Sequence, residues 1–139
     1  MHRVCIALVD ATRARFFTLD RSADGELEPL AEPSHLIQPA PEAHLRARHE
    51  TEFARTAMAA FREVIDEYSP ERAIVCADPG MLPKLEAAAP GLLPDELAVD
   101  ALACDFVTSP PAEIRAQLAA RGLLPPRRAR STLTDPLVK

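Results

Sequence analysis

VCIALVDATRARFF, residues 4–17, is the stretch that decides the fold of this chain. An apolar run from Val4 closes on Asp10, and a second apolar run opens at Phe16 and Phe17. The polar insert between them holds two arginines and contains neither Gly nor Pro. Two apolar runs separated by a short polar insert predict a β-hairpin. Asp10, at the end of the first run, is compatible with two interpretations. It can be a catalytic residue at a strand end, or it can belong to the first hairpin of a fold without catalytic activity.

The next segments predict an edge strand, a loop and a long helix. Residues 26–31 alternate polar and apolar positions around Pro29, which suits a strand at the edge of a sheet. Residues 33–41 contain three prolines and predict a loop. Residues 45–68 lack Gly and Pro, and their apolar side chains recur at intervals of three and four. That period predicts one long amphipathic helix that packs against a core.

The C-terminal half predicts two further strands, each followed by a helix. Residues 72–77 form a short apolar run, typical of a central strand covered on both faces. Residues 81–89 predict a short helix, and residues 97–106 a strand, although their Ala and Leu also favour helix. Residues 111–121 predict a last helix capped by Gly122.

The predicted order of elements is therefore β-β-β-α-β-α-β-α. Three meandering strands followed by alternating helices and strands predict an α/β fold, with a mixed five-stranded sheet and helices on its faces. This is the element order of the ribonuclease H-like fold. We expect residues 1–122 to form a single domain and residues 123–139 to form a mobile tail rich in Pro and Arg.

The composition is ordinary for a soluble globular protein. The chain is 47% hydrophobic and 27% charged, and no stretch approaches the roughly 18 apolar residues of a membrane span. With no recognisable targeting segment, the expected compartment is the cytoplasm. A net charge of −5 argues against coating nucleic acid by bulk attraction and leaves only a local basic patch open. Three isolated cysteines in apolar runs predict buried free thiols: Cys5, Cys76 and Cys104.

Carboxylates near three predicted elements suggest a two-metal nuclease as one hypothesis. In such enzymes, carboxylates from the first strand, the long helix and the fourth strand hold two Mg²⁺ ions about 4 Å apart. Asp10, Glu50 or Glu52, and Asp78 occupy these positions. Arg13 and Arg15, three and five residues after Asp10, oppose a metal site, and Asp78 before a Pro also suits the cap of a helix.

Arginines on the long helix suggest an RNA-contacting surface as a second hypothesis. Arg48, Arg55 and Arg62 are spaced by seven, so they stay within about 40° of one another around a helix. Such a row can follow phosphates. However, Glu52 and Asp66 lie four residues after Arg48 and Arg62, which equally predicts a solvated face of ion pairs.

Nucleophilic and metal chemistry have weaker signals. Cys76 lies inside a predicted strand and not at a strand-to-helix turn, and no serine stands in a Gly-x-Ser-x-Gly motif. Only His44 and His49 approach the spacing of metal ligands. We therefore expect no cofactor and no resident metal.

Three segments, in this order, resemble the bacterial host-attachment protein family, over about residues 3–121. The first two are a hairpin motif and the start of the long helix: Asp10-Ala11-x-Arg13-Ala14-Arg15-Phe16-Phe17 and His49-Glu50-x-Glu52-Phe53-Ala54. The third is a strand and turn: Ala73-Ile74-Val75-Cys76-Ala77-x-Pro79, followed by Leu82-Pro83-Lys84-Leu85. This chain departs from the family pattern at Asp78 and at Pro83-Lys84, where Pro and Gly are usual.

The resemblance implies a fold similar to the central domain of archaeal and eukaryotic peptide-chain release factors and of Pelota. It also implies RNA or ribosomal partners, for which Arg13, Arg15, Arg48 and Arg55 are candidate contacts. Release factors carry a catalytic Gly-Gly-Gln loop before the long helix. The equivalent residues 33–45 contain no Gly and only one Gln, so peptidyl-tRNA hydrolysis is not expected.

The favoured hypothesis is thus a non-enzymatic binding or adaptor module of host-attachment type. One alternative is a Mg²⁺-dependent nuclease that uses Asp10, Glu50 and Asp78. The other is a structural or oligomeric protein, such as a dimer, with an exposed apolar edge within residues 27–36.

Overall fold

The computed structural model contains the predicted elements in the predicted order. The residues it describes are 3–20, 27–30, 42–105, 107 and 109–123. The predicted loop at residues 33–41 and nearly all of the predicted tail lie outside this set. The described strands are β1 (Arg3–Val9), β2 (Ala14–Asp20), β3 (Glu28–Pro29), β4 (Arg72–Ala77) and β5 (Ala98–Ala103). The helices are a short 3-10 turn, η2 (Ala43–Leu45), and the α-helices α1 (Arg46–Tyr68), α2 (Leu82–Ala88) and α3 (Pro111–Ala120).

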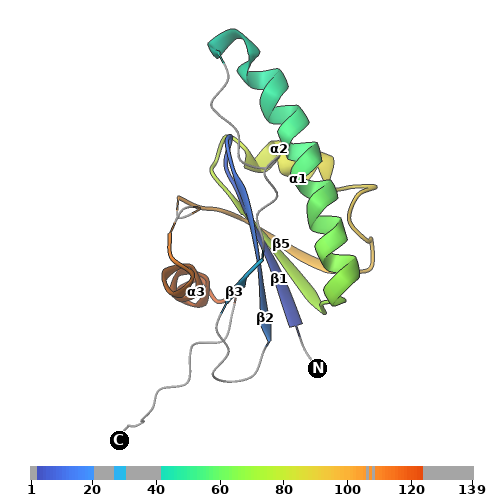
Figure 1. Ribbon diagram of the computed structural model, residues 1–139, viewed down its shortest axis with the longest axis vertical. Coiled ribbons are helices and arrows are strands. Elements are labelled where there is room, and N and C mark those ends of the chain that lie inside the picture. The colour runs from blue at the N-terminus through green and yellow to red at the C-terminus, as the bar shows by residue number, and fades with distance from the viewer. Residues whose placement is uncertain (1–2, 21–26, 31–41, 106, 108, 124–139) are drawn as a thin grey trace, which may run out of the picture.

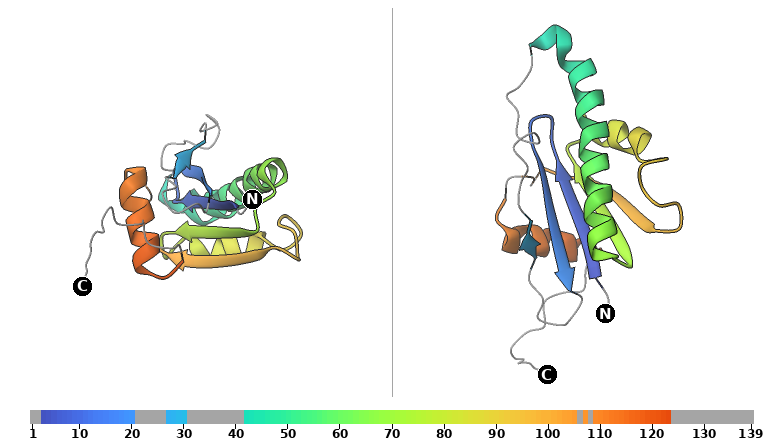
Figure 2. Two further views of the ribbon diagram at one scale, coloured as in Figure 1. Left: turned by 90° about the horizontal axis from the view of Figure 1, so that it is seen from below. Right: turned by 45° about the vertical axis from the view of Figure 1, so that its right-hand side comes forward.

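The five strands form one mixed sheet in the order β3-β2-β1-β4-β5. β1 pairs antiparallel with β2 and parallel with β4, and β5 runs parallel to β4. This order and these directions are those of the ribonuclease H-like fold, as predicted. Figure 1 shows α1 and α2 on one side of the strands and α3 on the other, and Figure 2 gives two further views of these layers.

The continuous apolar run of β1 exists because both of its faces are covered. Alternate side chains of a strand point to opposite faces. Cys5, Ala7 and Val9 lie in the hydrophobic cluster beneath α1 and α2. Val4, Ile6 and Leu8 lie in the cluster beneath α3. Each of these six side chains is almost completely buried, so β1 is the strand that both halves of the core share.

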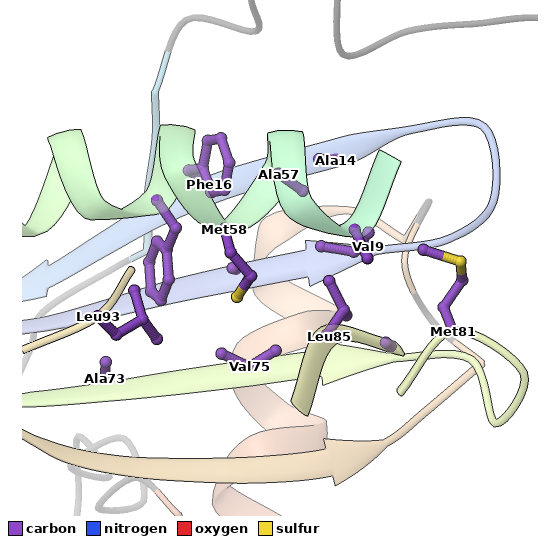
Figure 3. Packing of buried hydrophobic residues seen from close by; sticks show 14 of the residues in the cluster. Val9, Ala14, Phe16, Ala57, Met58, Ala73, Val75, Met81, Leu85 and Leu93 are labelled. Carbon is purple, nitrogen blue, oxygen red and sulfur yellow. The ribbon is translucent and has the colours of Figure 1, made fainter. Parts of the chain in front are cut away.

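The apolar stripe of α1 packs on this sheet as its period predicts. Figure 3 shows Ala57 and Met58 pointing from the helix toward the strands, with Leu85 of α2 nearby. Phe61 stacks on Phe16 of β2, with ring centroids 5.7 Å apart and planes 7° from parallel. The helix ends at Ser69, whose φ of 47° is left-handed and whose backbone N–H donates to Ile65 O.

The two edges of the sheet differ. β3 is an edge strand, as predicted, and it is only two residues long. The exposed apolar edge expected within residues 27–36 is not found at Leu27, which is 5% exposed, and residues 31–36 lie outside the described part. At the opposite edge, Val99 of β5 is 39% exposed, on the face of the sheet that α1 and α2 cover elsewhere.

No helix in the described ranges combines the length and the apolar character needed to cross a bilayer.

Candidate functional site

The carboxyl ends of β1 and β4 bring two of the predicted site residues together. Val9 and Ala77 are partners in the parallel ladder, and Asp10 and Asp78 directly follow them. Neighbouring strands lie about 4.8 Å apart, so the two aspartates are neighbours at the carboxyl-terminal ends of these two central strands. Both aspartates therefore follow the strand ends at which the sequence predicts them.

Each of these two carboxylates accepts hydrogen bonds from residues two or three positions later in the chain. Asp10 Oδ1 accepts hydrogen bonds from the backbone N–H of Thr12 at 2.8 Å and from Thr12 Oγ1 at 3.1 Å. Asp78 Oδ1 accepts from the backbone N–H of Met81 at 2.9 Å. Asp10 thus closes the hairpin turn, and Asp78 caps the turn that leads into α2.

The third carboxylate of the nuclease hypothesis is held by a lysine from another helix. Glu50 Oε1 of α1 lies 2.6 Å from Lys84 Nζ of α2, and the two side chains are only 15% and 29% exposed. Within the described ranges, no three His, Cys, Asp or Glu side chains are grouped so that they could hold a metal ion. The Glu50–Lys84 ion pair joins α1 to α2, and Lys84 remains partly exposed between the two helices.

His49 fastens the start of α1 to the hairpin. Its Nε2 lies 3.3 Å from the carbonyl oxygen of Ala11, and its ring stacks on Phe53 one turn later, with centroids 6.0 Å apart. His44 belongs to η2, before the helix begins. These contacts give His49 a structural role in the described part of the chain.

The arginines of α1 have different surroundings. Arg48 pairs with Glu52 at 3.6 Å, and Arg62 pairs with Asp66 at 2.9 Å, as the spacing of four residues predicted. Arg62 also donates to the carbonyl oxygen of Leu92 at 3.1 Å. Arg55 lies between them, is exposed, and has no side-chain partner among the described residues.

In the hairpin, the side chain of Arg15 and the backbone of Arg13 make structural contacts. Arg15 Nη1 donates to the carbonyl oxygens of Val107 and Ser109, each at 2.8 Å, and its guanidinium lies 4.9 Å from the ring centre of Phe17. Arg13 accepts the backbone N–H of Asp10 at 2.9 Å through its carbonyl oxygen. Arg15 thus ties β2 to the segment that leads into α3, away from the α1 surface.

The first part of α1 projects beyond the hairpin, as Figures 1 and 2 show. Residues 42–48 are all exposed, including Leu45 at 45%. Arg46 and Arg48 lie on this projection. Arg46 was not singled out by the sequence, because the seven-residue spacing of the other arginines does not include it.

A groove separates α1 from α2 and has a volume of about 220 Å³. Thr51 and Arg55 line it from α1, and Lys84 lines it from α2. The rest of its lining is apolar and comes from α2: Pro83, Ala87 and Ala88. Lys84 was also missed as a site residue, since its position opposite Arg55 depends on how α2 packs on α1.

The cysteines are buried and free, as predicted. Cys76 and Cys104 lie on the α3 face and their thiols interact, a pairing that the sequence did not predict. The hydrogen bond to Cys104 and then burial raise the pKa of the Cys76 thiol, against the opposing charge of Arg121. A thiol that stays protonated at neutral pH is a poor nucleophile.

A family of proteins described as required for attachment to host cells matches residues 32–118, which is more than half of the chain. The chain belongs to this host-attachment family. The match includes α1, β4, α2 and β5, and therefore the groove and the Glu50–Lys84 pair. Among the curated proteins, none matches this host-attachment protein in sequence.

Solved structures similar to this host-attachment protein are distant from it in sequence. A type II variant of the Ppx/GppA phosphatase from Aquifex aeolicus is 18% identical, with a TM-score of 0.48, over 74% of this chain and 36% of the phosphatase. The archaeal translation termination factor aRF1 is 14% identical, with a TM-score of 0.41, over 86% of this chain and 41% of the factor. The chain thus spans less than half the length of each.

Proposed function

We propose that this host-attachment protein is a non-enzymatic binding module that takes up structured RNA on the surface of α1. Arg55 and Arg48 are the principal contacts, since the ion pair of Arg48 with Glu52 is long, at 3.6 Å, and fully on the surface. Arg46 on the projecting end of the helix supports them. Arg62 contributes less, because Asp66 and Leu92 already occupy its guanidinium.

The observation that carries this proposal is the position of Arg55. Arg55 is exposed, lacks a side-chain partner in the described part of the chain, and lines a groove together with Lys84. Phosphate contacts from such cations give RNA binding that weakens as salt rises. Local cations can act in this way despite a net charge of −5, since charges beyond a Debye length of about 8 Å are screened.

Fluorescence anisotropy of a labelled RNA hairpin, measured at several salt concentrations, tests the proposal. We expect salt-dependent binding by the full chain, with a logarithmic slope that falls by about 0.7–0.9 for each phosphate contact removed. The double variant Arg48→Ala and Arg55→Ala should weaken binding at least tenfold. Arg62→Ala is the matched control, with an expected loss below twofold. If the full chain does not bind RNA at 50 mM salt, the proposal is wrong.

The neighbouring positions of Asp10 and Asp78 keep one enzymatic alternative worth testing, a Mg²⁺-dependent nuclease. It has less support, because Thr12, Lys84 and the Met81 backbone already occupy the three carboxylates. Incubation with structured RNA and with DNA in the presence of Mg²⁺ or Mn²⁺ separates the two functions. Cleavage that is lost in Asp10→Asn supports the nuclease and contradicts the binding module.

A further inference from the structure

We propose that the groove between α1 and α2 is a subsite for a single phosphate group, which the RNA backbone supplies. This inference rests on the proposed function and locates one of its contacts. The groove of about 220 Å³ lies between Thr51 and Arg55 on one helix and Lys84 on the other. Its walls thus come from two elements that pack together on one face of the sheet.

The charges of the groove favour an anion. Its two charged lining residues are Arg55 and Lys84, and no carboxylate is among the described residues that line it. Glu50 balances the charge of Lys84, so Arg55 supplies the unbalanced positive charge of the groove, and an anion there can contact both cations. Guanidinium and ammonium groups are the usual partners of phosphate oxygens.

Glu50 prepares Lys84 for this role from outside the groove. The Glu50 carboxylate holds Lys84 Nζ at 2.6 Å and is itself only 15% exposed, so the ammonium group is fixed before a ligand arrives. An ammonium group has three N–H donors, and the bond to Glu50 uses one of them. The two other donors remain for phosphate oxygens, and a side chain that is already ordered costs less entropy on binding.

The remaining lining and the size of the groove limit what enters. Pro83, Ala87 and Ala88 offer carbon surface, which suits the carbon face of a ribose next to the phosphate. A volume of about 220 Å³ is below the 300–1,000 Å³ of pockets that enclose a whole organic ligand. The groove therefore fits one phosphate and its sugar as part of a longer chain.

The decisive experiment compares three single variants of the full chain in the RNA anisotropy assay. Arg55→Ala should lower the affinity five- to twentyfold and reduce the salt slope by about 0.7–0.9. Arg62→Ala, seven residues later on the same helix and outside the groove, should change the affinity less than twofold. Arg48→Ala reports on the α1 surface outside the groove. If Arg48→Ala weakens RNA binding and Arg55→Ala does not, the subsite is wrong, and RNA binding by α1 then depends on Arg48 and not on Arg55.

A second arm uses inorganic phosphate and adenosine monophosphate as probes, with amide NMR shifts as the readout. Shifts at residues 51, 55, 84, 87 and 88 in the wild type, absent in Arg55→Ala, support the phosphate subsite. If these shifts occur while the wild type binds no RNA, the proposed function and the RNA source are both overturned, and a small phosphorylated ligand takes their place. If neither probe nor RNA perturbs the groove, the subsite is overturned.

Discussion

Glu50 and Lys84 are 34 residues apart in the chain, and they form an ion pair of 2.6 Å that joins α1 to α2. Removing the lysine leaves a carboxylate that is only 15% exposed without its partner. We expect Lys84→Met to lower the free energy of unfolding by about 1–3 kcal/mol, the usual effect of leaving a largely buried polar group unsatisfied. Urea denaturation measures this value. The double variant with Glu50→Gln should recover part of the loss, and an additive loss would show that the two side chains are not coupled.

Asp78 stabilises the start of α2 through its bond to the Met81 backbone. Asp78→Ala should cost about 1 kcal/mol of unfolding free energy, the usual net effect of losing one hydrogen bond within the protein. Asp78→Asn retains a side-chain oxygen and should cost less than half as much. Asp95→Ala, at an exposed carboxylate nearby in the sequence, should be neutral in the same urea titration. Equal losses in the Ala and Asn variants would show that the side-chain oxygen of Asp78 does not stabilise this turn.

Arg15 fastens the segment before α3 with two hydrogen bonds from one nitrogen. Arg15→Lys keeps the charge but loses the planar guanidinium, so we expect a loss of about 1–2 kcal/mol and faster amide hydrogen exchange in α3. Arg55→Lys, at an exposed position, should leave both quantities unchanged. Exchange that is faster throughout the protein, with no preference for α3, would argue against a local role.

The stacked rings of Phe16 and Phe61 lie at the centre of the core beneath α1. Phe61→Ala removes a completely buried ring and should destabilise the protein by about 3–5 kcal/mol. Leu45→Ala on the exposed end of the helix should cost less than about 0.5 kcal/mol. Thermal and urea unfolding of both variants give the comparison, and similar losses at the two sites would contradict the packing described.

Cys5 makes the stability of the protein sensitive to alkaline pH. Burial raises the pKa of its thiol from 9.0 to about 11, with the charge of Arg3 opposing the change. Between these values the unfolded chain binds fewer protons than the folded protein, so the free energy of unfolding falls as pH rises from 9 to 11. Below pH 9 this thiol has no effect. The fall should be smaller in Cys5→Ala, and an identical fall in both proteins would exclude the Cys5 thiol as its source.

The order of elements could be predicted because each left a local pattern. The run from Val4 to Val9 and the period of α1 both record which faces are buried, and burial of this kind is visible in a single sequence. The sequence of β5 also suits a helix, because three of its six residues are alanines. The tertiary pairing with β4 decided its conformation.

The sequence could predict the position of a site residue only where the pairing of the strands determines that position. Asp10 and Asp78 follow paired strands, so their proximity follows from the topology. The groove depends instead on the distance and rotation of α2 relative to α1, which no periodicity encodes. Arg55 therefore looked equivalent to Arg48 and Arg62 in the sequence, while in the structure it is the one of the three without a described carboxylate partner.

The shared position of β1 has a consequence for how the protein loses its structure. Cys5, Ala7 and Val9 belong to one hydrophobic cluster, and Ile6 and Leu8 to the other. Detaching either helical layer would expose one whole side of this strand to water, and the strand would then no longer hold the second layer. We therefore expect both layers to come apart in one cooperative transition, with β1 among the last segments to exchange its amide hydrogens.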